Sequence, residues 1–245
     1  DLPGVVSASG ELEAEKRVNV SPKRQGVIEE LYVEEGDPVS RVVELMASDH
    51  SRFPVLGDGV DAVLHFAGSI VVPDSVADPL AYYRNNTLNT HGLLQACVEQ
   101  GVGQFIFSST AAVYGDTALV PVPENAPTLP ISPYGASKLM SEWMLRDTAA
   151  AHGLRYVALR YFNVFGPRQD PDGAYAAVIP QWVSALIRNQ PLRINGDGET
   201  SRDFCFVGNV VQANLLAATT QNPEAVNQVY NVAVGDRTSL NRLFE

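Results

Sequence analysis

The sequence is poor in cysteine and in basic residues, and it has no long apolar run. Its two cysteines, Cys97 and Cys205, form no CxxC pair, which argues against a structural zinc site and a disulfide scaffold. The formal net charge is −11, so we expect no nucleic acid and no membrane as partners, because anionic phosphates need clustered Lys and Arg. The first residues show no secretion-signal pattern, and we therefore expect a cytoplasmic protein.

The chain changes character near residue 60. Residues 1–41 contain short β-rich runs broken by Gly, Pro and charged turns, which predicts a small antiparallel β segment, and residues 42–60 form a junction. From residue 61 onwards, continuous apolar runs alternate with helical patterns, which predicts one α/β domain over 61–245 with helices on both faces of a parallel sheet. We expect strands at 61–68, 104–110, 154–166 and 229–235, and helices at 86–101 and 132–153. Cys97 falls within an apolar stretch, so we expect a packed thiol.

Three of the predicted strands finish in small or polar residues: Ala67-Gly68, Ser108 to Thr110, and Phe162-Asn163. In an open parallel sheet, ligands bind beyond the carboxyl ends of the strands. We therefore expect these three endings to face a single crevice.

A tyrosine and a lysine follow in SPYGASK, with Ser132 as the expected N-cap of their helix. Tyr134 and Lys138 are four residues apart and so share one helical face. A nearby ammonium lowers a phenol pKa, and a hydroxyl from Thr110 would complete a site able to remove a proton from an alcohol. The alternative is an exposed pair of helical side chains. The hydroxyl-rich strand end upstream favours the site.

These residues lie in stretches that resemble a known family. HFAG, YYRNNTLNTHG, FSSTAAVYGD, SPYGASKLMSEW and LRYFNVFGPRQ are similar to the extended short-chain dehydrogenase/reductase family, specifically its nucleotide-sugar 4-epimerases. Over about residues 60–245 the sequence is similar to UDP-glucose and UDP-N-acetylglucosamine 4-epimerases. The resemblance implies a Rossmann-like doubly wound parallel sheet, truncated at both ends relative to the family and preceded by the short β segment.

The resemblance also implies a mechanism. Tyr134 would take the proton of the sugar 4-hydroxyl while hydride passes to NAD, and hydride would return to the other face of the 4-keto sugar. Thr110 would hydrogen-bond the same oxygen, and Lys138 would lower the Tyr134 pKa and hold the nicotinamide ribose. Ala111 and Ala112 stand where sugar 4,6-dehydratases of the family carry an acidic pair, which speaks against dehydration.

The matching positions imply two sets of binding residues. Those for NAD are Phe66, Ala67, Gly68, Asn85, Ser108, Tyr134, Lys138 and Phe162. Those for the UDP-sugar are Thr110, Tyr134, Asn163, Leu192, Arg193, Ile194, Asn195 and Arg202. For Arg202, a salt bridge with Asp203 or another acid is the alternative to a role as a diphosphate ligand.

Two departures from the family pattern support a different interpretation. The sequence contains no GxxGxxG turn, whose backbone N–H groups hold the NAD pyrophosphate, and residues 1–41 resemble a barrel-sandwich segment of membrane-fusion (efflux adaptor) proteins. The alternative function is therefore a non-catalytic mosaic, a structural or interaction protein that retains the epimerase core without a complete NAD site.

Family members of this type pair through two helices per subunit, so the resemblance implies a homodimer formed by helices 88–100 and 133–150. Leu139, Met140 and Trp143 would then be interface residues. The alternative is that these three side chains face the sheet.

Overall fold

The computed structural model describes residues 60–172 and 176–245, together with the backbone of two strands, β1 (Ile28–Leu31) and β2 (Val42–Glu44). Most of the predicted barrel-sandwich segment and most of the predicted junction lie outside the described residues. The two strands join the main sheet, because β1 pairs antiparallel with β2 and β2 pairs in parallel with β3 (Ala62–His65). The proposed domain boundaries at residues 41 and 60 stay predictions.

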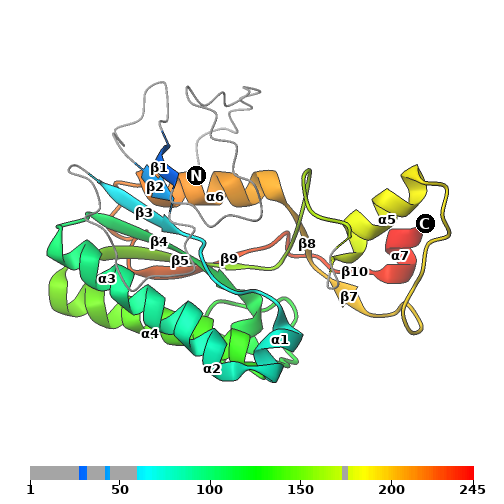
Figure 1. Ribbon diagram of the computed structural model, residues 1–245, viewed down its shortest axis with the longest axis horizontal. Coiled ribbons are helices and arrows are strands. Elements are labelled where there is room, and N and C mark those ends of the chain that lie inside the picture. Colours follow the sequence, from blue (N-terminus) through cyan, green and yellow to red (C-terminus); the bar gives the residue numbers. More distant parts are fainter. Residues whose placement is uncertain (1–27, 32–41, 45–59, 173–175) are drawn as a thin grey trace.

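The main sheet has six strands in the order β1-β2-β3-β4-β5-β9, and all except β1 run parallel (Figure 1). Two of its inner strands, β4 and β5, are almost fully buried, as expected of strands covered on both faces. The strands not yet given bounds are β4 (Gln104–Thr110), β5 (Arg155–Tyr161) and β9 (Gln228–Val232).

Helices cover both faces of this sheet. Figure 1 shows α3 (Asn89–Glu99) and α4 (Pro133–His152) on one side and α6 (Val207–Thr219) on the other. The doubly wound architecture expected from the sequence is therefore confirmed. Shorter elements connect β3 to α3 and follow β4: α1 (Val72–Ala77), α2 (Pro79–Tyr82), the π-helix η1 (Tyr83–Leu88) and the 3₁₀-helix η2 (Ala111–Tyr114).

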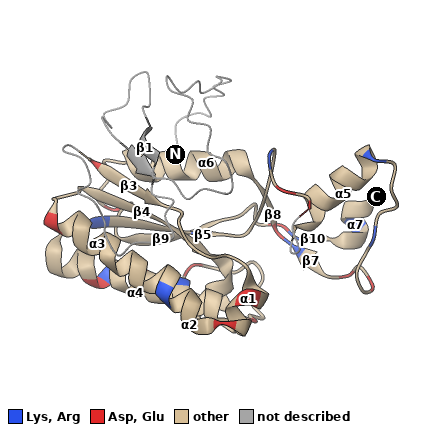
Figure 2. Cartoon of the chain, in the orientation of Figure 1, with Lys and Arg blue, Asp and Glu red and all other residues tan. Residues whose placement is uncertain are grey.

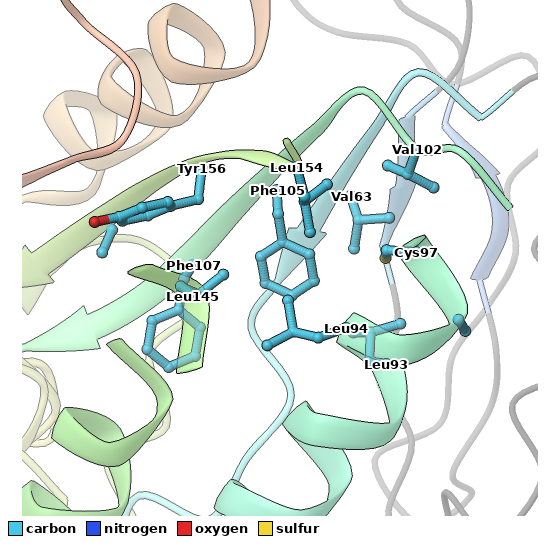
Figure 3. Close-up of a cluster of buried hydrophobic side chains, with 12 residues drawn as sticks. Val63, Leu93, Leu94, Cys97, Val102, Phe105, Phe107, Leu145, Leu154 and Tyr156 are labelled. Atoms are coloured by element: carbon cyan, nitrogen blue, oxygen red, sulfur yellow. The ribbon is translucent and has the colours of Figure 1, made fainter. Parts of the chain in front are cut away.

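The core is divided between the two faces by the alternation of side chains along the strands. In β4, Phe105 and Phe107 point to the side of α3 and α4, whereas Ile106 points to the side of α6. Figure 3 shows the cluster of buried apolar side chains on the side of α3 and α4, in which Cys97 lies among Val63, Leu94 and the Phe105 ring. Cys97 is fully buried, so the prediction of a packed thiol is confirmed.

The ends of α4 agree with the sequence pattern. The Ser132 hydroxyl accepts a hydrogen bond from the backbone N–H of Gly135, Pro133 occupies the first turn, and Gly153 ends the helix with a φ of 74°. The predicted helix at 86–101 differs in one respect. Its α-helical part begins at Asn89, and the turns before it form η1, which continues the helix back through α2.

The predicted strand at 154–166 is divided in two. β5 ends at Tyr161, and β6 (Asn163–Phe165) belongs to another sheet with β8 (Phe204–Phe206). The division follows from hydrogen bonding. Phe162 N–H still donates to Val232 in β9, but Asn163 N–H donates to Asp203, so the chain changes partner between these two residues.

The second sheet leads to a smaller lobe, which lies beside the main sheet in Figure 1. The strands β7 (Ser201–Arg202) and β10 (Thr238–Ser239) pair there, next to α5 (Val178–Ile187) and α7 (Leu240–Phe244). Trp182 of α5 and Phe244 of α7 contact edge to face, and Trp182 Nε1 donates to the carbonyl of Arg193. Within the described residues, no helix is both long and apolar enough to cross a bilayer.

Candidate functional site

The carboxyl ends of β3, β4 and β5 meet at one edge of the sheet. The register pairs His65 with Phe107 and Thr110 with Tyr161, so β4 extends three residues past the end of β3. The turn that begins with Phe66 thus starts beside the hydroxyl-bearing end of β4. The strand endings for which a common crevice was predicted therefore lie at the same edge of the sheet.

Tyr134 stands over this edge at the start of α4. Its hydroxyl is hydrogen-bonded to the side chain of Thr110, the last residue of β4. Burial raises the pKa of Tyr134, the hydrogen bond with Thr110 lowers it, and Tyr82 raises it further. The two hydroxyls that the sequence analysis combined are thus in contact.

Lys138 lies one turn further along α4 and is only 2% exposed. Its Nζ donates to the carbonyl oxygen of Ser108 at 2.9 Å and lies 5.0 Å from the centre of the Phe107 ring. Burial lowers the pKa of Lys138 to about 8. The alternative of an exposed helical pair is therefore wrong for Lys138.

The electrostatic relation between the two residues differs from the expectation. We expected Lys138 to lower the pKa of Tyr134, but on balance that pKa is raised, and burial is the largest cause. The ammonium is bonded to the strand carbonyl instead of the phenol. The shared helical face brings both side chains to the same strand without pairing them.

The turn after β3 is held close to Lys138 by an asparagine that the sequence analysis missed. Asn86 is buried, accepts from the Ser69 N–H at 2.7 Å, and donates to the Ser69 carbonyl and the Ser137 hydroxyl. A Cβ on Gly68 would lie 3.1 Å from Asn86 Oδ1 and 3.4 Å from Lys138 Nζ. Asn86 lies in the π-helix η1, and such turns are frequent at functional sites, but this feature is visible only in the structure.

The predicted NAD residues gather at this edge. Asn85 donates to the Ser69 hydroxyl at 2.9 Å, and Phe162 packs against the small cluster that contains Val113 and Tyr114. Phe66, Ala67 and Gly68 are partly buried and follow β3 directly. The predicted NAD residues therefore lie at neighbouring strand ends or on the helices that start there.

The predicted UDP residues separate into two groups. Asn163 and Arg202 line one cavity of about 260 Å³ at the start of the smaller lobe, together with residues of α5. The stretch 192–195 does not line this cavity and follows α5, where the carbonyl of Arg193 accepts from Trp182. Only part of this set is therefore brought together.

The alternative proposed for Arg202 is not what the structure shows. The carboxylate of Asp203 accepts hydrogen bonds from the backbone N–H groups of Val234 and Gly235, at 2.9 and 2.8 Å. Arg202 is exposed, its Nη1 donates to the carbonyl of Ser201, and it takes part in none of the ion pairs of the described residues. Its guanidinium remains available to a ligand.

Charges and metal ligands are sparse around the site. Figure 2 shows Lys and Arg dispersed along the described part of the chain instead of gathered in one area. Among the described residues, no group of three or more His, Cys, Asp and Glu is arranged to hold a metal ion. The groups available for chemistry at this edge are therefore the hydroxyls of Thr110 and Tyr134 and the ammonium of Lys138.

Comparison with known proteins agrees with this geometry. Residues 15–233 match the NAD dependent epimerase/dehydratase family, a match that begins well before residue 60. A UDP-glucose 4-epimerase of Azospirillum brasilense is 53% identical over 172 residues, which cover 64% of this chain and 49% of that protein.

Solved structures give the same picture. The UDP-N-acetylglucosamine 4-epimerase of Methanobrevibacter ruminantium M1, in complex with UDP-N-acetylmuramic acid, is similar with a TM-score of 0.72 and 46% identity over 75% of this chain and 58% of that one. The UDP-glucose 4-epimerase of Thermotoga maritima, with UDP-glucose, has a TM-score of 0.70 and 40% identity over 75% and 59%. The chain thus spans about half to three fifths of these relatives.

Proposed function

We propose that this chain, which belongs to the NAD dependent epimerase/dehydratase family, catalyses the NAD-dependent 4-epimerisation of a UDP-hexose or a UDP-N-acetylhexosamine. The observation that carries this proposal is the hydroxyl pair of Tyr134 and Thr110 above the buried ammonium of Lys138. Similarity to proteins named UDP-glucose and UDP-N-acetylglucosamine 4-epimerase supports the substrate class.

In the proposed reaction, Tyr134 removes the proton from the sugar 4-hydroxyl and returns it. Thr110 holds the same oxygen, because its hydroxyl already contacts the phenol. Burial disfavours the phenolate, so a positive charge in the crevice is needed. We propose that Lys138, one helical turn away, supplies this charge. Its ammonium donates to the Ser108 carbonyl and not to the phenol, so it would favour the phenolate by electrostatic attraction through space.

The residues at the edge fit the nicotinamide half of NAD. Gly68 leaves its backbone open beside Lys138 and Asn86, in space that a Cβ would fill. When bound, NAD supplies the acceptor and donor for the hydrogen at the sugar C4. The residues proposed to hold it are Phe66, Ala67, Gly68, Asn85, Ser108, Tyr134, Lys138 and Phe162. A pyrophosphate site before residue 60 would lie outside the described residues.

The UDP moiety is proposed to bind at the smaller lobe. Arg202 presents an unpaired guanidinium at the 260 Å³ cavity, where it suits a diphosphate, and Asn163 lies at the same cavity. The stretch 192–195, which follows α5, is proposed to reach the uridine from outside this cavity.

The first experiment tests the purified chain with NAD and either UDP-glucose or UDP-N-acetylglucosamine, with separation of the C4 epimers. We expect conversion of at least one sugar, and a loss of about 10²–10⁴-fold in Tyr134→Phe, the usual contribution of a positioned base. NAD binding should persist in this variant. Full activity of Tyr134→Phe, or no turnover with bound NAD, would contradict the proposal. A product without the C6 oxygen would indicate dehydration, for which Ala111 and Ala112 offer no proton-transferring group.

We also propose a homodimer formed by the outer faces of α3 and α4. A hollow of about 570 Å³ lies between these helices. Trp143 and Met140, which line a separate hollow of about 260 Å³ on α4, are 48% and 36% exposed. Leu139 is 3% exposed and belongs to the core, so its assignment to the interface was wrong. Sedimentation should show a dimer that Trp143→Glu converts to a monomer, and a wild-type monomer would overturn this proposal.

A further inference from the structure

Three consecutive residues at the end of β4 are each bonded to α4. The Ser108 carbonyl accepts from Lys138, the Ser109 hydroxyl donates to Glu142 Oε1, and the Thr110 side chain is hydrogen-bonded to Tyr134. On the helix, residues 134, 138 and 142 are spaced by four, so they form one stripe that faces the strand. Glu142 is the one member of the stripe without a role in the proposed chemistry.

Glu142 is held from the other side by an arginine of β5. Arg160 donates through Nε to Glu142 Oε1 at 2.9 Å and through Nη2 to Oε2 at 2.6 Å, and both side chains are about 5% exposed. Ser109 and Arg160 are also register partners in the sheet. The bidentate contact therefore joins α4 to two strands at the level of the proposed active site.

The same guanidinium reaches the loop that follows the proposed catalytic threonine. Arg160 Nη1 donates to the Tyr114 hydroxyl at 2.8 Å and to the Glu124 carbonyl at 3.2 Å. Tyr114 donates in turn to Asn231 of β9, whose amide bonds the carbonyl of Val122. One buried network thus fixes α4, the central strands and the loop beyond η2 relative to one another.

A buried ion pair of this kind often adds little net stability. Replacing a buried ion pair by apolar residues of similar volume often leaves a protein equally stable or more so, because desolvation offsets the attraction. What the charges add is a unique geometry, since bidentate bonds tolerate little displacement. In this chain the geometry defined is the separation between Thr110 and Tyr134.

We propose that the Glu142–Arg160 pair, linked to the strand through Ser109, is a positioning element that holds Tyr134 and Lys138 of α4 in register with the end of β4. Neither residue touches the reacting atoms. The kinetic consequence rests on the proposed 4-epimerase function, but the placement of Lys138 can be measured without it.

The sharpest variant is Ser109→Ala, because removing Glu142 or Arg160 alone would leave a buried charge unpaired and endanger folding. Its matched control is Ser141→Ala. Ser141 is equally buried on α4, but its hydroxyl donates to Ser137 of the same helix and bridges nothing. Both variants lose one buried hydroxyl, and only the first loses a link between helix and strand.

We expect Ser109→Ala to lower kcat about tenfold with unchanged KM, because small misplacements of a catalytic group cost one to two orders of magnitude (roughly 10²-fold for 1 Å). The pH profile of kcat should move to higher pH as Tyr134 loses its contact with Thr110. Ser141→Ala should leave both unchanged. Arg160→Lys keeps the charge without the bidentate contact and should also lower kcat.

A second readout does not need turnover. The sequence has three lysines, Lys16, Lys23 and Lys138, so carbon-13 labelling at lysine Cε gives three signals that single Lys→Arg or Lys→Met variants assign. In Ser109→Ala we expect the apparent pKa of Lys138 to rise by about 0.5, a small part of the 3–5 that full burial can remove. The titratable neighbours on the stripe, Tyr134 and Glu142, are the same in both serine variants.

Each outcome decides the matter. A Lys138 titration and kinetics that are the same in Ser109→Ala as in Ser141→Ala would overturn the proposal and leave the network a purely structural role. If the wild-type chain has no epimerase activity, the proposed function fails, and the Lys138 titration alone then supports or rejects the positioning role.

Discussion

Lys138 and Arg202 are both cations assigned to the site, and the structure treats them in opposite ways. Lys138 is 2% exposed, and its ammonium is bonded to a strand carbonyl in the centre of the sheet. Arg202 lies exposed in the smaller lobe, where its guanidinium contacts the carbonyl of the residue before it. Contacts within the core fix the position of the Lys138 ammonium, whereas no comparable contacts fix the Arg202 guanidinium, which can adjust to a ligand.

The difference reflects how each part of the site is built. A buried charge needs partners, so every element around Lys138 is connected by hydrogen bonds before any ligand arrives. In the smaller lobe, the polar residues lie on two-residue strands and loops, and the Asp203 carboxylate holds the loop after β9 through backbone N–H groups. The residues proposed for proton transfer are therefore preorganised. The residues proposed to bind UDP are expected to become ordered only when UDP binds.

The strongest test of this contrast is Lys138→Met. Turnover should fall by about 10²-fold or more, because the cation that favours the phenolate is lost. The free energy of unfolding at pH 7 should nevertheless rise, by up to roughly 3 kcal/mol, because lowering the pKa from 10.5 to about 8 costs about 1.4 kcal/mol per pKa unit. Denaturant unfolding of both proteins measures this gain.

The pH dependence has a definite sign. The Lys138 pKa is lower in the folded protein than in the unfolded one, so between about pH 8 and 10.5 the unfolded state binds more protons. The wild-type protein therefore gains stability over this range, and the advantage of Lys138→Met should shrink and vanish. A variant that is less stable than wild type at pH 7 would show that the ammonium is net stabilising.

Arg202→Ala should have a smaller effect than Lys138→Met, and it should change KM for the UDP-sugar instead of kcat or stability. Loss of one or two charge-assisted hydrogen bonds, each worth roughly 1.5–3 kcal/mol, should raise KM for the UDP-sugar by about 10–100-fold. Stability and kcat should change little, because the side chain is exposed and touches no reacting atom. Arg188→Ala is the matched control, since Arg188 is an exposed arginine of the same lobe that makes a surface ion pair with Asp172. An equal change of KM in Arg202→Ala and Arg188→Ala would show that Arg202 is not a specific ligand of the UDP-sugar.

The smallest expected effect is that of Asp203→Asn. The NH₂ group of the amide cannot accept, so at least one of the three contacts from the Val234 and Gly235 N–H groups is lost, and we expect a loss of about 1 kcal/mol, or about 2–4 °C in Tm. Asp236→Asn is the control, because Asp236 accepts only from the adjacent Arg237 N–H. A larger loss in Asp203→Asn would show that the smaller lobe is as tightly coupled to the sheet as α4 is.

Much of the fold followed from local patterns. The strand at 104–110 and the helix with its Ser132 cap were predicted with nearly the bounds observed, because continuous apolar runs, a capping serine and a final glycine each act locally. The stretch predicted as one strand at 154–166 forms two strands, β5 and β6, because its interruption depends on Asp203, about forty residues away. Apolar composition gave no sign of a change of partner.

The candidate site divides in the same way. Tyr134 and Lys138 were recognised from their spacing, and the structure brings them to the strand end that carries Thr110. The same spacing did not reveal that the Lys138 ammonium bonds a strand carbonyl, or that burial raises the Tyr134 pKa. Asn86 and Arg160 were missed because their partners lie on other elements.

Local sequence patterns were enough to predict the class of the sheet, the helix that carries Tyr134 and Lys138, and the epimerase/dehydratase family, because periodicity, caps and motif spacing are properties of short stretches. The tertiary structure alone decided which polar groups are buried and with whom they pair. Those pairings join β4, β5, β9 and α4, and their energies depend on burial, which exists only once the chain has folded.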